Sequence, residues 1–322
     1  MAAIAEATAP AAPASSSAYE RRPGWGAWLF MAPLLAWLVL FVVAPSLLLV
    51  VYSFLERDSL GRIVWNFTGD NYLRAIDWPT LKNLPHAIAT HGWQGVVDSY
   101  YALSWFRILL ESVWYAFLTT VICMIVGFPA AWFIGRAPER FRNLLMMLVM
   151  IPFWTSFLIR TYAWITILSR DGFLNAFLLS AGIINTPLVM MYTPFAVVLG
   201  LVYNYLPFMI LPIYTSVEKL DNALVEAAQD LGAGPVRAFS KVIIPLTRPG
   251  IAAGALLVFV PAIAMFAITT LMGGGRVPTI GDVIQKQFTA ARNPPFGAAL
   301  GSLLLLIFFV SLWFTQARKH RD

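Results

Sequence analysis

The sequence predicts an all-α membrane protein with six transmembrane helices. Of its 322 residues, 59% are hydrophobic and 12% are charged, and the mean hydropathy is +0.73. Charged residues make up about a quarter of an ordinary soluble domain, so this composition excludes that class. The apolar residues form continuous runs of about 20, the length that crosses a hydrocarbon core as a helix. A membrane β-barrel would show shorter, alternating segments.

Six apolar segments follow one another along the chain. The predicted spans are 28–54, 108–134, 144–168, 193–215, 250–272 and 298–315. Prolines lie inside several of them, and membrane bundles tolerate such prolines because neighbouring groups satisfy the freed backbone. Residues 25–317 are therefore predicted to form one transmembrane domain.

The two ends of the chain are predicted to be short tails. Residues 1–24 are rich in Ala, Ser and Pro and lack the apolar core of a signal peptide, so we expect a disordered tail. Residues 318–322 form the second tail. Lys and Arg flank the spans with a bias that places both tails in the cytoplasm. The same bias makes 217–249 a cytoplasmic loop and 55–107 an extracytoplasmic one.

The loop 55–107 is too long for a simple turn and is rich in aromatic residues. It carries Trp65, Trp78, Trp93 and Trp105. Rings of this kind suit an amphipathic segment at the membrane–water interface. They equally suit a docking surface for an external protein, and the residues themselves leave both interpretations open.

The loop 217–249 has a more definite local chemistry. Residues 220–231 contain few helix breakers, and Asp221 can cap a helix there. Gly232 and the Gly234–Pro235 pair end that helix. A second short helix is expected over 235–242, with Pro245 and Pro249 closing the element before the fifth span. The prediction is a helix, a turn and a second helix.

One side of the first loop helix is expected to serve as a contact surface. Ala227 and Ala228 leave a thin face on which another backbone could come close. Glu226 and Asp230, spaced i and i+4, place two carboxylates on one side. A docking surface for a partner and an ordinary solvated loop helix both account for this pattern.

A longer pattern in this loop resembles a known signature. Glu226-Ala227-Ala228 is followed after three residues by Gly232 and after nine more by Val242, Ile244 and Pro245. This arrangement resembles the signature of permease subunits of ABC importers. The resemblance implies a type I ABC-importer permease bundle. It also implies that Glu226, Ala227, Ala228, Asp230, Gly232 and Pro245 belong to a coupling helix that docks into a cleft of the ATP-binding subunit.

Three further stretches narrow the resemblance to spermidine/putrescine permeases. Residues 151–164 read Ile-Pro-Phe-Trp-Thr-Ser-Phe-Leu-Ile-Arg-Thr-Tyr-Ala-Trp, and 171–175 and 296–302 are also similar to that subgroup. The resemblance implies import of a polyamine across the bacterial inner membrane. It further implies an extracytoplasmic solute-binding protein and a second permease subunit, and it favours a different chain for the latter.

Sequence features of an enzyme or an ATPase are missing. The chain has no Gly-x-x-x-x-Gly-Lys-Ser/Thr loop, and its three histidines show no metal-ligand spacing. No pairing of a nucleophile with a base is recognisable. We therefore expect no cofactor and no catalytic activity in this chain, with ATP-Mg used by a partner subunit. The basic residues lie at the ends of spans, which indicates contact with lipid rather than with nucleic acid.

Two ionisable residues fall within predicted spans, where they are costly and point to function. Glu111 is expected either to attract a cationic solute, alone or paired with Arg160, or to lie at the interface. Arg160 would repel a polyamine, so helix packing or contact with a binding protein suits it better. Ring faces could also hold a cation along the pathway. The candidate rings are Trp154, Tyr162, Trp164, Tyr203 and Tyr205.

Other functions remain compatible with parts of the sequence. A permease of the same kind could carry a different small solute. A gradient-driven secondary transporter would need acidic residues or histidines in mid-span, which are scarce here. A membrane interaction protein without transport activity would use the loop 217–249 as a scaffold.

Overall fold

The computed structural model describes the backbone of residues 25–58 and 60–319. The chain divides into two compact units, residues 1–48 and 49–322, and each is described by itself. The predicted tail 1–24 lies outside the described residues. Of the predicted tail 318–322, only residues 318 and 319 are described, at the end of the last helix.

The first predicted span is a nearly continuous helix with one π turn. It comprises α1 (Trp25–Leu38), η1 (Val39–Val43) and α2 (Ala44–Ser53). In η1 the amide of Ala44 bonds to the carbonyl of Val39, five residues earlier. Pro45 follows directly and has no amide to donate. Local π geometry is one way in which a membrane helix accommodates a proline.

The loop after the first span is folded, and part of it is β structure. Strands β1 (Leu55–Arg57) and β2 (Ile63–Phe67) pair antiparallel. Helices α3 (Asp70–Ala75) and α4 (Trp78–Ala102) follow, and α4 is kinked at Gly92. This short hairpin is the β structure that the structure adds to the predicted all-α fold. Its second strand, Ile-Val-Trp-Asn-Phe, is rich in residues that favour strands, and Gly61 supplies the positive φ of 82° that the turn needs.

Asp77 joins this loop to the second span, α5 (Trp105–Arg136). Its backbone is left-handed, and its Oδ2 accepts from the amides of Ser104 and Trp105 at 2.9 Å and of Phe106 at 3.3 Å. These amides have no partner within the helix, and a carboxylate there also suits the helix dipole. The cap comes from 27 residues earlier in the chain, so no local sequence signal predicts it.

Replacing Asp77 with alanine is expected to destabilise the start of α5. The loss of a helix cap costs about 1 kcal/mol, and a charged acceptor for several amides adds to this. Asp77→Asn keeps one acceptor and should lie between the wild type and Asp77→Ala. Thermal unfolding of the purified chain measures the effect. Asp98→Ala is the matched control, because that carboxylate accepts from Gln94 within its own helix; an equal loss in both variants would contradict the role of Asp77.

The third predicted span is broken. Helices α6 (Glu139–Trp154) and α7 (Phe157–Leu168) meet at Thr155–Ser156, and the continuation through α8 (Phe173–Ser180) is bent by 88° from α6. The prediction of one continuous helix over 144–168 is therefore wrong. The Thr155 hydroxyl donates to the carbonyl of Pro152 at 2.7 Å, a local bond that competes with helical hydrogen bonding.

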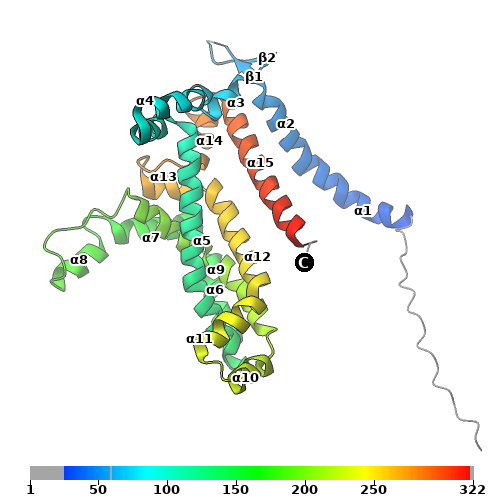
Figure 1. Cartoon of the computed structure of the whole chain (residues 1–322), viewed down its shortest axis with the longest axis vertical. Helices are drawn as coiled ribbons and strands as arrows, with labels where there is room; N and C mark the ends of the chain where they lie inside the picture. The colour runs from blue at the N-terminus through cyan, green and yellow to red at the C-terminus, as the bar shows by residue number, and fades with distance from the viewer. Residues whose placement is uncertain (1–24, 59, 320–322) are drawn as a thin grey trace, which may run out of the picture. The chain divides into compact units, whose positions relative to one another are not determined.

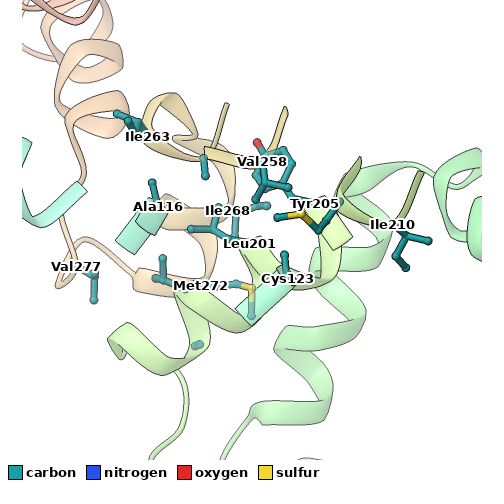
Figure 2. Packing of buried hydrophobic residues seen from close by; sticks show 14 of the residues in the cluster. Ala116, Cys123, Leu201, Tyr205, Ile210, Val258, Ile263, Ile268, Met272 and Val277 are labelled. Carbon is teal, nitrogen blue, oxygen red and sulfur yellow. The ribbon is translucent and has the colours of Figure 1, made fainter. Parts of the chain in front are cut away.

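Three long helices form the core of residues 49–322. α9 (Pro194–Glu218) packs against α5 and against α12 (Ile244–Ala264). Figure 2 shows Cys123 of α5, Leu201 and Tyr205 of α9 and Val258 of α12 in this buried cluster. A small residue lies at the contact between α9 and α12. A side chain on Gly250 of α12 would overlap the Ser216 hydroxyl and the Pro212 carbonyl of α9.

The last predicted loop and span differ from expectation in their boundaries. After α10 (Asn222–Asp230), the chain runs without a break through α11 (Pro235–Ala238), η2 (Phe239–Ile243) and α12. Pro245 and Pro249 lie inside this helix, so the prediction that they end the loop element is wrong. The π turn of η2, in which the amide of Ile244 bonds to the Phe239 carbonyl, precedes Pro245 as η1 precedes Pro45.

The fifth span ends earlier than predicted. α12 stops at Ala264, and α13 (Ala267–Gly273), α14 (Ile280–Thr289) and α15 (Pro294–Lys319) follow. At this break the hydroxyls of Thr269 and Thr279 donate to the carbonyl of Met265 at 3.2 and 3.3 Å. They satisfy a backbone group that the helix no longer uses, which the hydropathy pattern alone does not reveal.

The helical membrane fold is confirmed. Among the described residues, four helices are long and apolar enough to span a membrane, and five if the bent pair counts as one span. The apolar part of α15 within those residues, Pro294–Val310, is shorter. Within residues 49–322, α10 and α11 lie at one end and β1, β2, α3 and α4 at the other (Figure 1).

Candidate coupling surface and translocation pathway

The predicted helix–turn element of the loop 217–249 is present. The Asp221 carboxylate accepts from the amide of Ala223 at 3.0 Å and caps α10. The chain leaves α10 through Gly232, whose φ is 84°, while the Gly232 amide bonds to Gln229 at 2.8 Å and the Ala233 amide to Ala228 at 3.0 Å. The turn therefore closes on the last carbonyls of the helix, as glycine allows.

The predicted docking residues lie largely on the surface. Glu226, Ala227, Asp230 and Gly232 are exposed, whereas Ala228 is half-buried, so the two alanines do not share one open face. Pro245 is half-buried within the long helix and lies apart from the turn.

Exposed apolar side chains surround these residues, and sequence reasoning did not single them out. Leu231 is 89% exposed and Val236 80%, and Leu224 is also exposed. Large apolar side chains that are open to solvent on a loop between spans are typical of a contact surface. The loop sequence mixes polar and apolar residues, so it does not show which apolar side chains are exposed. Their exposure depends on how the turn folds.

Two hollows border the loop. One, of about 390 Å³, lies between α5 and the loop and is lined by Trp132, Val225, Gln229 and Phe239 among others. A more open one, of about 590 Å³, is lined by the turn itself, from Gly232 to Lys241. An inserted side chain or loop of a partner could occupy either of them.

An ion pair ties the base of the loop to the bundle. Glu218, the last residue of α9, accepts from Arg142 of α6 at 3.0 Å and from the Tyr214 hydroxyl at 2.9 Å. Glu218 lies at the start of the loop 217–249, where α9 ends. Sequence reasoning missed this contact because its partners lie 76 residues apart.

Four of the five aromatic candidates for the pathway form two groups rather than one site. Trp154 and Tyr162, on either side of the α6–α7 break, are 77% and 57% exposed. Trp164 of α7 lies edge-on to Tyr203 of α9, with ring centroids 5.5 Å apart, and both are half-buried. The structure brings together only the second pair.

The structure separates Glu111 from Arg160. Glu111 pairs with Arg107 of its own helix at 3.4 Å, so the alternative that it pairs with Arg160 is wrong. Spacing i to i+4 on one helix outweighs a contact between distant segments. The Arg160 guanidinium lies 5.9 Å from the centre of the Phe153 ring, and its Nε and Nη1 are buried without an acceptor.

Two further features were missed by sequence reasoning. The Phe153 ring, which faces Arg160, also contacts the ring of Phe208 of α9, with centroids 5.0 Å apart. Phe208 in turn contacts the ring of Tyr205. Asp282 of α14 is a buried carboxylate, 2% exposed, which binds Lys286 at 2.7 Å and the Thr270 hydroxyl at 2.7 Å. Asp282 lies outside the six predicted spans, so the sequence did not indicate it as a charge within the membrane.

Residues 105–320, from α5 to the end of α15, match the family model described as the binding-protein-dependent transport system inner membrane component. The chain belongs to this family. It is therefore a multi-pass inner-membrane component of an ABC transporter, as the signature in the loop 217–249 indicates.

Known members of the family match most of the chain. The spermidine/putrescine transport system permease protein PotB of Escherichia coli K12 is 44% identical over 274 residues, which is 85% of this chain and 90% of that protein. The PotB protein of Haemophilus influenzae is 39% identical over 291 residues, covering 90% of this chain and 93% of that protein. Both relatives are named as transport permeases, a role without catalysis.

Solved structures of ABC transporters share the fold of this family member. The crystal structure of a bacterial ABC transporter involved in the import of the acidic polysaccharide alginate matches with a TM-score of 0.66 and 15% identity. It covers 92% of this chain and 96% of that chain. A second structure, in complex with an alginate pentasaccharide-bound periplasmic protein, matches with a TM-score of 0.64 and 15% identity, covering 92% of this chain and 94% of that chain.

Proposed function

We propose that this chain is a permease subunit of an ATP-driven importer of polyamines such as spermidine and putrescine. The relatives with 39–44% identity over most of the chain are named for transport of these two solutes. The chain provides the membrane pathway and leaves ATP hydrolysis to a partner.

The observation that carries the proposal is the loop at one end of residues 49–322. It presents exposed carboxylates at Glu226 and Asp230 beside exposed apolar side chains, and its second helix is continuous with α12. A partner that grips this surface can therefore move a transmembrane helix directly. A motor subunit needs such a connection to alternate access between the two membrane faces.

The partners follow from this arrangement. ATP-binding subunits, holding ATP-Mg, would dock on the Glu226–Asp230 surface. An extracytoplasmic binding protein would deliver the solute at the opposite end, near β1, β2 and α4. With the loop in the cytoplasm, both termini are cytoplasmic as well, in agreement with the distribution of Lys and Arg.

The break between α6 and α7 supports a second permease subunit. At 1.5 Å per residue the 16 residues of α6 span about 24 Å, less than the roughly 30 Å hydrocarbon core. Thr155 and Ser156 at the break are exposed. Lipid cannot satisfy irregular backbone at this depth, so protein or a water-filled pathway must cover it. A second, different permease chain would do so and complete the pathway.

Uptake of labelled spermidine into proteoliposomes tests the proposal. Uptake should require the ATP-binding partner and ATP, and putrescine should compete with spermidine. Uptake that persists without ATP would establish a gradient-driven transporter instead. ATP-dependent uptake of an unrelated small solute, with no uptake of spermidine or putrescine, would overturn the polyamine assignment while keeping the importer.

Replacing Glu226 with alanine should lower ATP-dependent uptake about tenfold or more. Losing one partner of a buried charge pair costs about 2–5 kcal/mol, and each 1.4 kcal/mol is tenfold. Glu139→Ala is the matched control, an exposed acidic residue at the start of α6. ATP-driven uptake that is unchanged in Glu226→Ala would show that this surface does not transmit the motion.

A further inference from the structure

The turn that joins α5 to α6 carries an apolar groove with a basic rim. The groove, of about 490 Å³, is lined mainly by carbon atoms of Phe133, Pro138, Phe141 and Leu145, with Arg136 at its edge. Phe133 is 67% exposed and Phe141 46%, so the groove opens outward. Together with the arginines beside it, we call this feature the elbow groove.

Three arginines lie in the seven residues from 136 to 142, at the turn between α5 and α6. Two of them have no acidic partner in the part of the chain that the structure describes. Arg142 is engaged with Glu218. Arg136 instead lies over the Trp132 ring at 4.5 Å, with Nε and Nη2 buried without an acceptor, and Arg140 lies over the Phe141 ring at 4.7 Å. Aromatic faces hold these cations in place but leave their charge uncompensated.

An apolar strip leads from the groove along α6. Leu144, Met147, Leu148 and Ile151 follow the helical spacing i, i+3, i+4 and i+7, and each is exposed by 40–51%. The strip extends the groove by about 10 Å in the direction of the hydrocarbon core. A soluble acidic partner would meet the two arginines but would leave this strip uncovered.

We propose that the elbow groove binds an anionic phospholipid of the cytoplasmic leaflet. The phosphate would pair with Arg136 and Arg140, since guanidinium groups suit phosphate oxygens. One acyl chain would lie in the groove and along the α6 strip, where burial of apolar surface favours it. Basic pockets at the cytoplasmic ends of membrane helices have the chemistry that anionic headgroups need.

The proposed lipid would lie next to the contact that fixes the loop 217–249. Arg142, six residues beyond Arg136, holds Glu218 at the end of α9, and its Nη2 also donates to the Gly135 carbonyl at 3.4 Å. A bound headgroup would neutralise the two neighbouring arginines, which otherwise repel Arg142 and compete with it for Glu218. The site is independent of which solute the chain transports.

Lipid retention by the full chain, purified in neutral detergent and delipidated, tests the proposal. Native mass spectrometry should show that phosphatidylglycerol is retained about tenfold more strongly than phosphatidylcholine with the same acyl chains. The double variant Arg136→Gln/Arg140→Gln should bind the two lipids equally. Arg248→Gln, which removes an exposed arginine on α12, should retain the preference. Equal binding of both lipids to the wild type, or an equal loss in Arg248→Gln, would overturn the site.

Two further measurements keep the test decisive if the double variant fails to fold. Photoactivatable phosphatidylglycerol should cross-link to the wild-type chain within residues 133–151, both alone and in the assembled transporter. Cross-links elsewhere, or their loss when the ATP-binding subunit is added, would overturn the proposal, the latter in favour of a protein partner. Displacement of the lipid by inorganic phosphate alone would reveal a simple anion site instead.

Discussion

Replacing Gly250 with alanine is expected to weaken the packing of α9 against α12 and to reduce the yield of folded chain. The added methyl group would overlap the Ser216 hydroxyl and the Pro212 carbonyl oxygen. The hydroxyl can rotate away, but the carbonyl belongs to the backbone of α9, so the two helices must separate. Overpacking of this kind costs about 1–3 kcal/mol.

Thermal unfolding in detergent and fluorescence-detected size exclusion measure this effect. Gly69→Ala is the matched control, because it makes the same chemical change where no atom lies within 4 Å and where φ is −92°. Gly250→Leu should abolish folding. If Gly250→Ala were as stable as Gly69→Ala, the close approach of the two helices would be wrong.

Arg160→Met is expected to separate stability from function. In the chain alone the guanidinium has two buried nitrogens without an acceptor. Replacing an unsatisfied buried charge with an apolar side chain of similar length should raise the stability of the isolated chain, by about 1–3 kcal/mol. Uptake by the assembled transporter should fall about tenfold or more. A charged residue within a membrane span is costly, so its presence indicates a role in transport.

The matched control for this variant is Arg170→Met, which removes an exposed arginine just beyond α7 and should leave both properties nearly unchanged. A loss of stability in Arg160→Met would assign Arg160 to helix packing, the other role that its position in the sequence permits. Unchanged uptake would remove Arg160 from the pathway altogether.

Hydropathy and capping patterns predicted much of the fold because they depend on local chemistry. The helices α5 and α9, the cap at Asp221 and the turn at Gly232 lie where neighbouring residues place them. The loop signature likewise identified the family before any contact was known. These features require only a few consecutive residues.

The features that were missed arise either from contacts between distant segments or from local backbone geometry that hydropathy and proline rules do not reveal. The break at Thr155–Ser156 lies inside an apolar run, and the cap of α5 comes from Asp77 in another loop. Pro245 was expected to end a helix, yet the π turn before it lets the helix continue. The alternative in which Glu111 pairs with Arg160 is wrong, because Arg107, one turn earlier on the same helix, is the partner of Glu111.

The continuity of helix from Pro235 to Ala264 has a mechanical consequence. Its 30 residues measure about 45 Å from end to end. A tilt of roughly 5° at α11 would therefore displace the far end by about 4 Å, more than the radius of a methylene chain. In the proposed coupling role, a small push at α11 would become an opening of molecular size at the far end of α12, with the π turn at Phe239–Ile243 as the place where the helix can bend.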